Sequence, residues 1–210
     1  SFTHDRFDRE RFEAIRAIAA EMIAAGADAP AERAREFEAL FAAQAGYATP
    51  KVDVRAAVFR DDRILLVRER SDGRWTLPGG WADVGDSPAA AVEREALEES
   101  GFEVRAVKLA AVYDRNRHAH TPYVFHIWKL FFLCEIVGAA AGETSRVPAE
   151  PAPGSARAEA HTQASWSETD AVDFFPENAL PPLSLGRVTA LQIAHMFEHH
   201  RDRERPTGFD

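Results

Sequence analysis

The stretch that decides the fold runs Gly80-Trp-Ala-Asp-Val-Gly-Asp-Ser-Pro-Ala-Ala-Ala-Val-Glu-Arg-Glu-Ala-Leu-Glu-Glu-Ser-Gly-Phe102. Its second half predicts a helix over residues 88–100. Ser87 is the expected N-cap because its hydroxyl can accept from a free backbone N–H of the first turn. Pro88 suits the first helical position, and Gly101 is placed to end the helix.

Three carboxylates lie on one face of this predicted helix. Glu95, Glu98 and Glu99 are three and four residues apart, and residues with that spacing are neighbours on a helix surface. Like charges held together repel unless a cation lies among them, and oxygen ligands favour Mg²⁺ or Mn²⁺. A solvated acidic face is the simpler explanation of such a cluster. Two features favour a metal site: Gly80 lets backbone approach a ligand closely, and Arg94 can bond Asp86 and hold the loop.

The stretch resembles the signature of the Nudix hydrolase family, G-x5-E-x7-R-E-U-x-E-E-x-G-U, in which U is a bulky apolar residue. Two positions depart from it: Asp86 stands where Glu is usual, and Ala96 where a larger aliphatic residue is usual. We expect a looser contact between Asp86 and Arg94 and tighter packing of the helix on the sheet. The positions that match are Gly80, Arg94, Glu95, Glu98, Glu99, Gly101 and Phe102.

The resemblance implies an α+β fold, an α/β/α sandwich with a mixed sheet, and a metal-dependent hydrolase. It implies that Glu95, Glu98 and Glu99, with the Gly80 carbonyl, bind Mg²⁺ or Mn²⁺. The cation would stabilise charge on a diphosphate while a metal-bound water attacks phosphorus. Glu99 is the proton acceptor that we favour within the signature. Acids outside it stay open as alternatives, namely Glu143, Glu159 and Glu168.

The first fifty residues predict a small helical extension, 1–50, ahead of a hydrolase domain at 51–205. The first helix is expected to have Asp8 as its cap and Gly26 as its end, and a second helix to start at Pro30. Residues 138–163 are rich in Ala, Pro, Gly, Ser and Glu and predict a mobile surface insertion. A last helix is expected at 185–200, with a fraying tail at 199–205. Strands are expected at 52–59, 64–67, 75–77, 102–113, 123–137 and 164–166.

The extension resembles that of a Nudix subgroup associated with ADP-ribose and CDP-choline pyrophosphatases. The same subgroup is suggested by Gly46–Arg55, Leu77–Gly85 and Tyr113–His118. The function implied is hydrolysis of the diphosphate bond in ADP-ribose or CDP-choline. Alternatives are hydrolysis of an oxidised nucleoside triphosphate and a non-catalytic nucleotide-sensing module. A prenyl-diphosphate isomerase would need a catalytic cysteine, which Cys134 on a strand does not supply.

Candidate substrate contacts lie outside the signature. Arg115 and Arg117, with two nearby histidines, form a basic cluster that could clamp a phosphate, although an ordinary polar loop is equally compatible. Trp81 is a candidate for stacking on a base or a choline cation, against the alternative of rim packing. Arg55 is proposed to contact a phosphate across a dimer.

Composition narrows the class of protein. The chain has 210 residues, one cysteine and a formal net charge of -9, so no global attraction to nucleic acid is expected. No run approaches the roughly 20 apolar residues that cross a bilayer. The single cysteine is compatible with a cytoplasmic location. The apolar faces of the N-terminal helices favour a homodimer, because two short helices need a partner surface.

Overall fold

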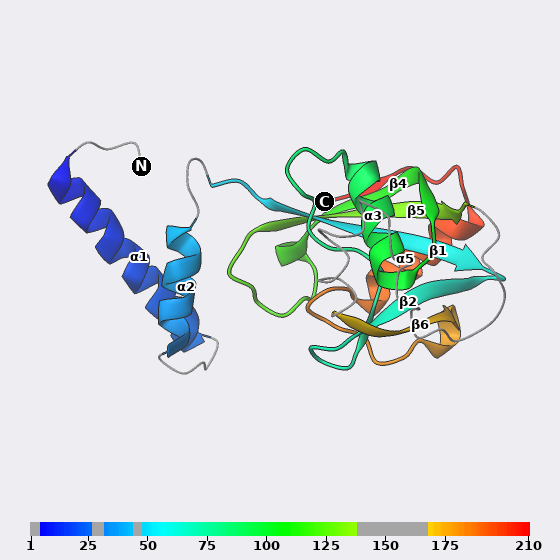
Figure 1. The fold of residues 1–210 in the computed structure, drawn as a ribbon, viewed down its shortest axis with the longest axis horizontal. Coiled ribbons are helices and arrows are strands. Elements are labelled where there is room, and N and C mark those ends of the chain that lie inside the picture. The colour runs from blue at the N-terminus through cyan, green and yellow to red at the C-terminus, as the bar shows by residue number, and fades with distance from the viewer. Residues whose placement is uncertain (1–4, 27–31, 44–47, 138–167) are drawn as a thin grey trace, which may run out of the picture. The chain divides into compact units, whose positions relative to one another are not determined.

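The computed structural model describes residues 5–26, 32–43, 48–137 and 168–210 (Figure 1). The chain divides into two compact units, 1–50 with 122–126, and 51–121 with 127–210. The expected insertion at 138–163, the expected strand at 164–166 and the alternative bases Glu143 and Glu159 lie outside the described residues. Within the described ranges, no helix is both long and apolar enough to cross a membrane.

The N-terminal unit contains α1 (Arg6–Gly26) and α2 (Glu32–Ala42), which pack on each other. The cap of α1 differs from the prediction. Asp5, not Asp8, accepts hydrogen bonds from the backbone N–H groups of Phe7 and Asp8, at 2.7 and 3.1 Å. Asp8 instead pairs with Arg11 one turn further on. The helix therefore begins earlier than its apolar pattern suggested.

One face of α1 is apolar and exposed. Only Ala20 and Ala24 of this helix are buried. Its large apolar side chains are between 38 and 69% exposed, and they recur at helical spacing: Phe7, Phe12, Ile15, Ile18, Met22 and Ile23. A face of this kind on a helix is a surface available to a partner.

The second unit is built on a mixed sheet in the order β3-β2-β1-β5-β4-β7, with β6 also paired to β2. β1 pairs with β5 in parallel and β4 with β7 in parallel, while the other pairings are antiparallel. The strands are β1 (Lys51–Arg60), β2 (Arg63–Glu69), β3 (Trp75–Thr76), β4 (Val104–Asp114), β5 (Ile127–Ile136), β6 (Thr169–Pro176) and β7 (Gly208–Phe209).

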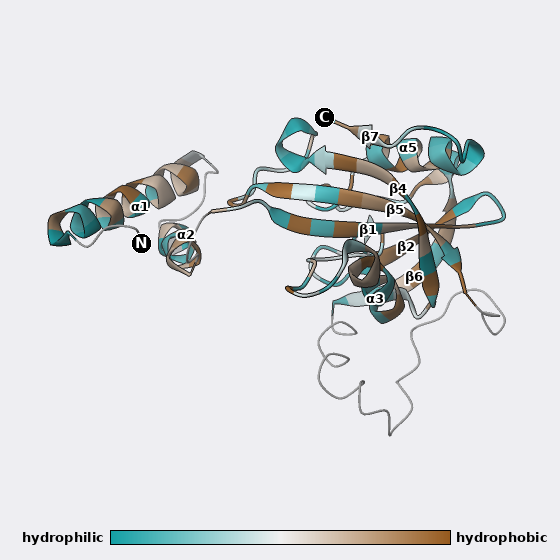
Figure 2. Ribbon diagram, turned by 90° about the horizontal axis from the view of Figure 1, so that it is seen from above, coloured by the Kyte–Doolittle hydropathy of each residue, from teal (hydrophilic) through white to brown (hydrophobic). Residues whose placement is uncertain are grey.

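Helices cover both faces of this sheet, as Figure 2 shows from above. α3 (Pro88–Ser100) buries Ala91, Val92 and Ala96 against side chains of β1, β2 and β5. α5 (Ala190–Arg201) packs on the opposite face through Ile193, Met196 and Phe197. The predicted α/β/α sandwich is confirmed, and Ala96 is fully buried as its small size implied.

The C-terminal region corrects two predictions. The last helix begins at Ala190, not at 185, because Thr189 and Gln192 form a capping box that starts it. The tail does not fray: β7 adds to the edge of β4, and Lys108 donates to the carbonyls of Arg203 and Arg205, at 2.7 and 2.5 Å. These contacts join residues far apart in sequence, so no local pattern reveals them.

Candidate active site

The ends of α3 are formed by the residues that the sequence indicated. The Ser87 hydroxyl accepts from the N–H of Ala90 at 3.1 Å, and Pro88 occupies the first turn. Gly101 adopts a left-handed conformation with φ 72° and donates to the carbonyl of Leu97. Local residues alone therefore fix both ends of the helix that carries the carboxylates.

The glycine loop before α3 lies along an open edge of β1. β1 pairs with β2 only at its far end, at Phe59 and Arg60. Nearer its start, residues 78–82 take the place of a neighbouring strand. Three backbone bonds of 2.8 to 3.0 Å hold them there, Val54 to Gly80, Ala56 to Pro78 and Ala82 to Val52. Because β1 is buried in the core, these hydrogen bonds fix the position of the glycine loop.

Gly79 is required by this close approach. A Cβ at this position would stand 2.0 Å from the carbonyl oxygen of Val54, and φ is 141°. Its backbone N–H donates to Oε2 of Glu99 at 2.9 Å. The glycine thus ties the last turn of α3 to the loop.

The carboxylates of α3 lie together, but two of them are paired with Arg94. Nη1 of Arg94 lies 2.9 Å from Oε1 of Glu95 and 3.2 Å from Oε2 of Glu98. The same guanidinium contacts Asp86 at 3.3 Å, as predicted, and Asp83 at 3.2 Å. A cation held between two glutamates shows that positive charge is stabilised at this point.

Whether a divalent ion suits these residues depends on their chemistry and on space. Across the residues that the structure describes, no three His, Cys, Asp or Glu side chains converge tightly enough to enclose a metal. The donors are nonetheless all oxygens. Oε2 of Glu95 lies 2.8 Å from the point where a Cβ of residue 80 would stand, so only a glycine leaves this space. A set of oxygen donors of this kind suits a hard divalent cation.

Burial changes the acidity of the carboxylates. Glu99 is 4% exposed, and burial raises its pKa to about 8, against the lowering effects of Arg55 and of the Gly79 N–H. Burial also raises the pKa of Glu95, which Arg94 opposes. Neighbouring carboxylates raise both values further. A divalent cation would favour the charged forms and reverse these shifts.

Arg55 is buried within the sheet. Its side chain is 5% exposed and pairs with Asp53 at 2.7 Å, and it also donates to the Leu77 carbonyl at 3.0 Å. Asp53 in turn accepts from the buried Lys129 at 2.6 Å. Burial acts to raise the pKa of Asp53, but the two cations together hold it at about 2. The charge of Arg55 is thus engaged within the fold, and its contact with a phosphate across a dimer stays a prediction.

The other candidate contacts separate into buried and exposed groups. Arg115 is 4% exposed and donates to the carbonyls of Thr121 and Gly186, so it braces two loops. Arg117 is exposed. Trp81 is 43% exposed beside the glycine loop and bridges to Asp53 through its backbone. Of these, Arg117 and Trp81 remain accessible to a ligand.

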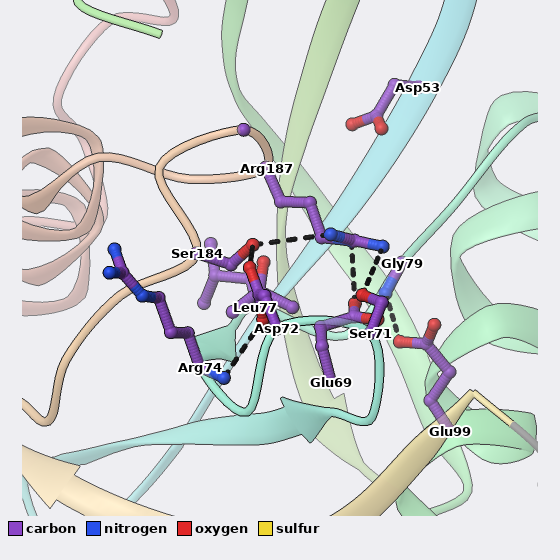
Figure 3. Close-up of polar contacts among 12 residues, drawn as sticks. Asp53, Glu69, Ser71, Asp72, Arg74, Leu77, Gly79, Glu99, Ser184 and Arg187 are labelled. Atoms are coloured by element: carbon purple, nitrogen blue, oxygen red, sulfur yellow. Dashed lines mark hydrogen bonds and ion pairs between the residues drawn. The ribbon is translucent and has the colours of Figure 1, made fainter. Parts of the chain in front are cut away.

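Sequence reasoning missed a charged network next to the glycine loop (Figure 3). Glu69 at the end of β2 is 3% exposed and pairs with Nε of Arg187 at 2.8 Å. Arg187 also donates to Ser184 at 3.3 Å and Ser71 at 3.4 Å, and Ser184 donates to Asp72 at 2.7 Å. No periodic pattern in the sequence marks these residues. The one feature that could have indicated the network is that its residues come from two segments rich in polar residues.

Comparison with known proteins agrees with this geometry. The family model described as NUDIX domain matches residues 49–187, which is more than half of the chain. The chain belongs to the Nudix family. A second model, described as UDP-X-like, N-terminal oligomerisation domain, matches residues 1–37 of this Nudix hydrolase. Nudix hydrolases generally use divalent metal ions, in keeping with the oxygen donors of α3.

Two of three similar proteins cover the whole length of this Nudix hydrolase. A putative ADP-ribose pyrophosphatase of Bacillus subtilis (strain 168) is 38% identical over 210 residues, which is 100% of this chain and 89% of that protein. An ADP-ribose pyrophosphatase structure from Streptococcus suis 89-1591 is 40% identical, with a TM-score of 0.59, and covers 77% of this chain and 100% of its own. A UDP-X diphosphatase structure is 31% identical, with a TM-score of 0.61, and covers 100% of this chain and 89% of its own.

Proposed function

We propose that this Nudix hydrolase cleaves the diphosphate bond of a nucleoside diphosphate joined to a second group, with ADP-ribose or CDP-choline as the favoured substrates. The observation that carries the proposal is the cluster of Glu95, Glu98 and Glu99 on one face of α3, against a glycine loop. The names of two relatives, which cover 100% and 77% of this chain, support ADP-ribose in particular.

The proposed ligands of a Mg²⁺ or Mn²⁺ ion are Glu95, Glu98 and Glu99 with the Gly80 carbonyl. That carbonyl already accepts from the N–H of Val54 at 2.9 Å, and a carbonyl oxygen has a second lone pair for a cation. When bound, the ion would neutralise charge on the diphosphate. Arg94, released from Glu95 and Glu98, would keep its contacts with the loop aspartates.

Glu99 is the proposed acceptor of the proton of the attacking water. Its Oε2 is fixed by the Gly79 N–H, so the carboxyl group has a defined orientation relative to the loop. A positioned base needs such an orientation more than it needs a particular resting charge. Glu168 begins the described segment before β6 and is an alternative from outside the signature.

The proposed assembly is a homodimer formed through the N-terminal helices. Its support is the exposed apolar face of α1 and the match to an oligomerisation domain. We keep 1–50 and 51–205 as the proposed domains. A mass measurement in solution tests the assembly, and a monomer at all concentrations would contradict it.

The activity is tested by offering ADP-ribose, CDP-choline, a UDP-linked sugar and a nucleoside triphosphate with Mg²⁺ or Mn²⁺, and measuring released monophosphate. Glu98→Gln should reduce turnover by at least about 100-fold, since it removes a charged metal ligand. The matched control is Glu103→Gln, because Glu103 is exposed just beyond the same helix. Turnover by Glu98→Gln at the wild-type rate would overturn the metal assignment.

A further inference from the structure

Arg187 is a partly exposed cation beside the glycine loop. Its side chain is 35% exposed, whereas the carboxylate of Glu69 to which it is bound is 4% exposed. Arg187 lies just before the capping box of α5, and Glu69 ends β2, so two distant segments meet here. Figure 3 shows its guanidinium pointing toward Gly79, with Glu99 beyond that glycine.

The pair belongs to the electrostatic field of the active site. Arg55 and Glu99 interact with each other, and Glu69 raises the pKa of Glu99. Burial raises the pKa of Glu69 itself, and Arg187 opposes this rise. A buried carboxylate without a partner would be costly, so Glu69 holds the arginine in place as much as the arginine holds Glu69.

The three nitrogens of the Arg187 guanidinium make contacts of different length. Its Nε lies 2.8 Å from the charged Glu69, a short contact. Its two terminal nitrogens donate to neutral serine hydroxyls at 3.3 and 3.4 Å, which are long contacts. The terminal nitrogens of a guanidinium form the fork that matches two phosphate oxygens. Serine hydroxyls can rebond to water, so this fork can exchange partners at small cost.

Three other arginines, Arg55, Arg115 and Arg94, lack such a weakly engaged fork. The guanidinium groups of Arg55 and Arg115 are buried and bonded to Asp53 or to loop carbonyls. Arg94 lies among the carboxylates of α3. Arg187 combines a fixed Nε with weakly engaged terminal nitrogens.

We propose that Arg187, anchored by Glu69, binds non-bridging oxygens of the substrate diphosphate at the site of Glu99. The inference rests on the proposed function, since it names a further contact of the same substrate. Arg187 is the substrate contact, and Glu69 is a positioning residue that acts through it.

The test is Arg187→Lys, which keeps a positive charge beside Glu69 and removes the fork. The matched control is Arg68→Lys. Arg68 precedes Glu69, pairs with Asp170 at 2.6 Å and has a 41% exposed side chain. We expect KM for the substrate to rise roughly 10- to 100-fold in Arg187→Lys, as for lost hydrogen bonds to a charged group. We expect kcat within about threefold of wild type, and no change in Arg68→Lys.

A binding measurement gives a second readout. Calorimetry with Mg²⁺ and ADP whose bridging oxygen is replaced by methylene should show the same rise in Kd for Arg187→Lys. A rise in KM or Kd of less than about threefold would overturn the proposal. If the melting temperature falls while KM and Kd stay in that range, Arg187 has a structural role only. If wild type cleaves none of the nucleoside diphosphate derivatives, the proposed function fails, and the Kd comparison still decides the role of Arg187.

Discussion

Glu95 and Gly80 are in such close contact that Oε2 of the glutamate lies 2.8 Å from where a Cβ on residue 80 would be. The contact joins the proposed metal-binding face of α3 to the backbone that precedes it. Because the atom met is the end of a flexible side chain, a methyl group here would displace the carboxylate and leave the backbone in place.

We therefore expect Gly80→Ala to lower activity with little loss of stability. Turnover should fall by about 10-fold or more, because a small displacement of a metal ligand disturbs the reacting geometry. The free energy of unfolding should change by less than about 1 kcal/mol. Kinetics and urea denaturation of the same preparation measure both effects. A stable variant with full activity would show that Glu95 does not need its present position.

Gly79→Ala should instead lower the stability of the protein strongly. Its Cβ would meet the Val54 carbonyl at 2.0 Å, and this atom belongs to the backbone of a buried strand. We expect a loss of stability of roughly 3 kcal/mol or more, since both the clash and the positive φ oppose the substitution. Gly85→Ala is the control: φ is 102°, with no other atom within 4 Å of its Cβ. Equal losses in the two variants would assign the effect to φ alone.

His120 should make stability depend on pH. Its Nδ1 lies 2.8 Å from the Leu185 carbonyl and its Nε2 lies 3.0 Å from Nε2 of Gln192. A neutral ring satisfies both, by donating to the carbonyl and accepting from the amide, whose oxygen is occupied by the N–H of Thr189. Burial lowers the pKa of His120 to about 4, and the charges of Lys129 and Arg115 act in the same direction.

Below pH 6.5 the unfolded chain therefore takes up this proton before the folded chain does. The stabilising contribution is present above that pH and is lost as pH falls toward 4. Between about pH 7 and about pH 5 we expect the urea midpoint to fall less in His120→Gln than in wild type, while Glu99, whose pKa burial raises to about 8, contributes with the opposite sign in both proteins. Burial lowers the pKa of His199 in the same way, so part of the pH dependence should remain. An identical fall in wild type and variant would contradict the assignment.

Cys134 should resist thiol reagents in the folded protein. It is 5% exposed on β5, and burial raises the pKa of its thiol to about 12, so almost no thiolate exists at neutral pH. Labelling by iodoacetamide at about pH 8 should be slow in buffer and fast in denaturant. Rapid labelling of the native protein would show local opening of the sheet.

The sequence predicted well the parts of the fold that depend on near neighbours. Ser87, Pro88 and Gly101 determine α3 by contacts within a few residues, and the spacing of its glutamates follows from helix geometry. Thr189 and Gln192, three residues apart, form a recognisable capping-box pattern that marks the start of α5. The apolar pattern around them extends further toward the N-terminus and predicts a start at residue 185, which is wrong.

Other features depend on residues that meet only after folding. The basic character of Arg55 and Arg115 predicts phosphate contacts, whereas their burial follows from the sheet and from loop packing and has no signal in the sequence. The pair of Glu69 and Arg187 joins a strand end to a distant loop, and no spacing rule connects them. A charged residue in a sequence indicates that its side chain needs an oppositely charged or hydrogen-bonding partner if it is buried. The sequence does not indicate which residue or ligand that partner is.

β1 changes its neighbour along its length, from β2 at Phe59 and Arg60 to the glycine loop between Val52 and Ala56. The position of β1 therefore determines the position of both the core residues and the glycine loop. A core substitution that slides β1 along its axis would shift the carboxylates without touching them. Variants selected for activity alone should then include apolar residues of this strand, distant from any charge in the site.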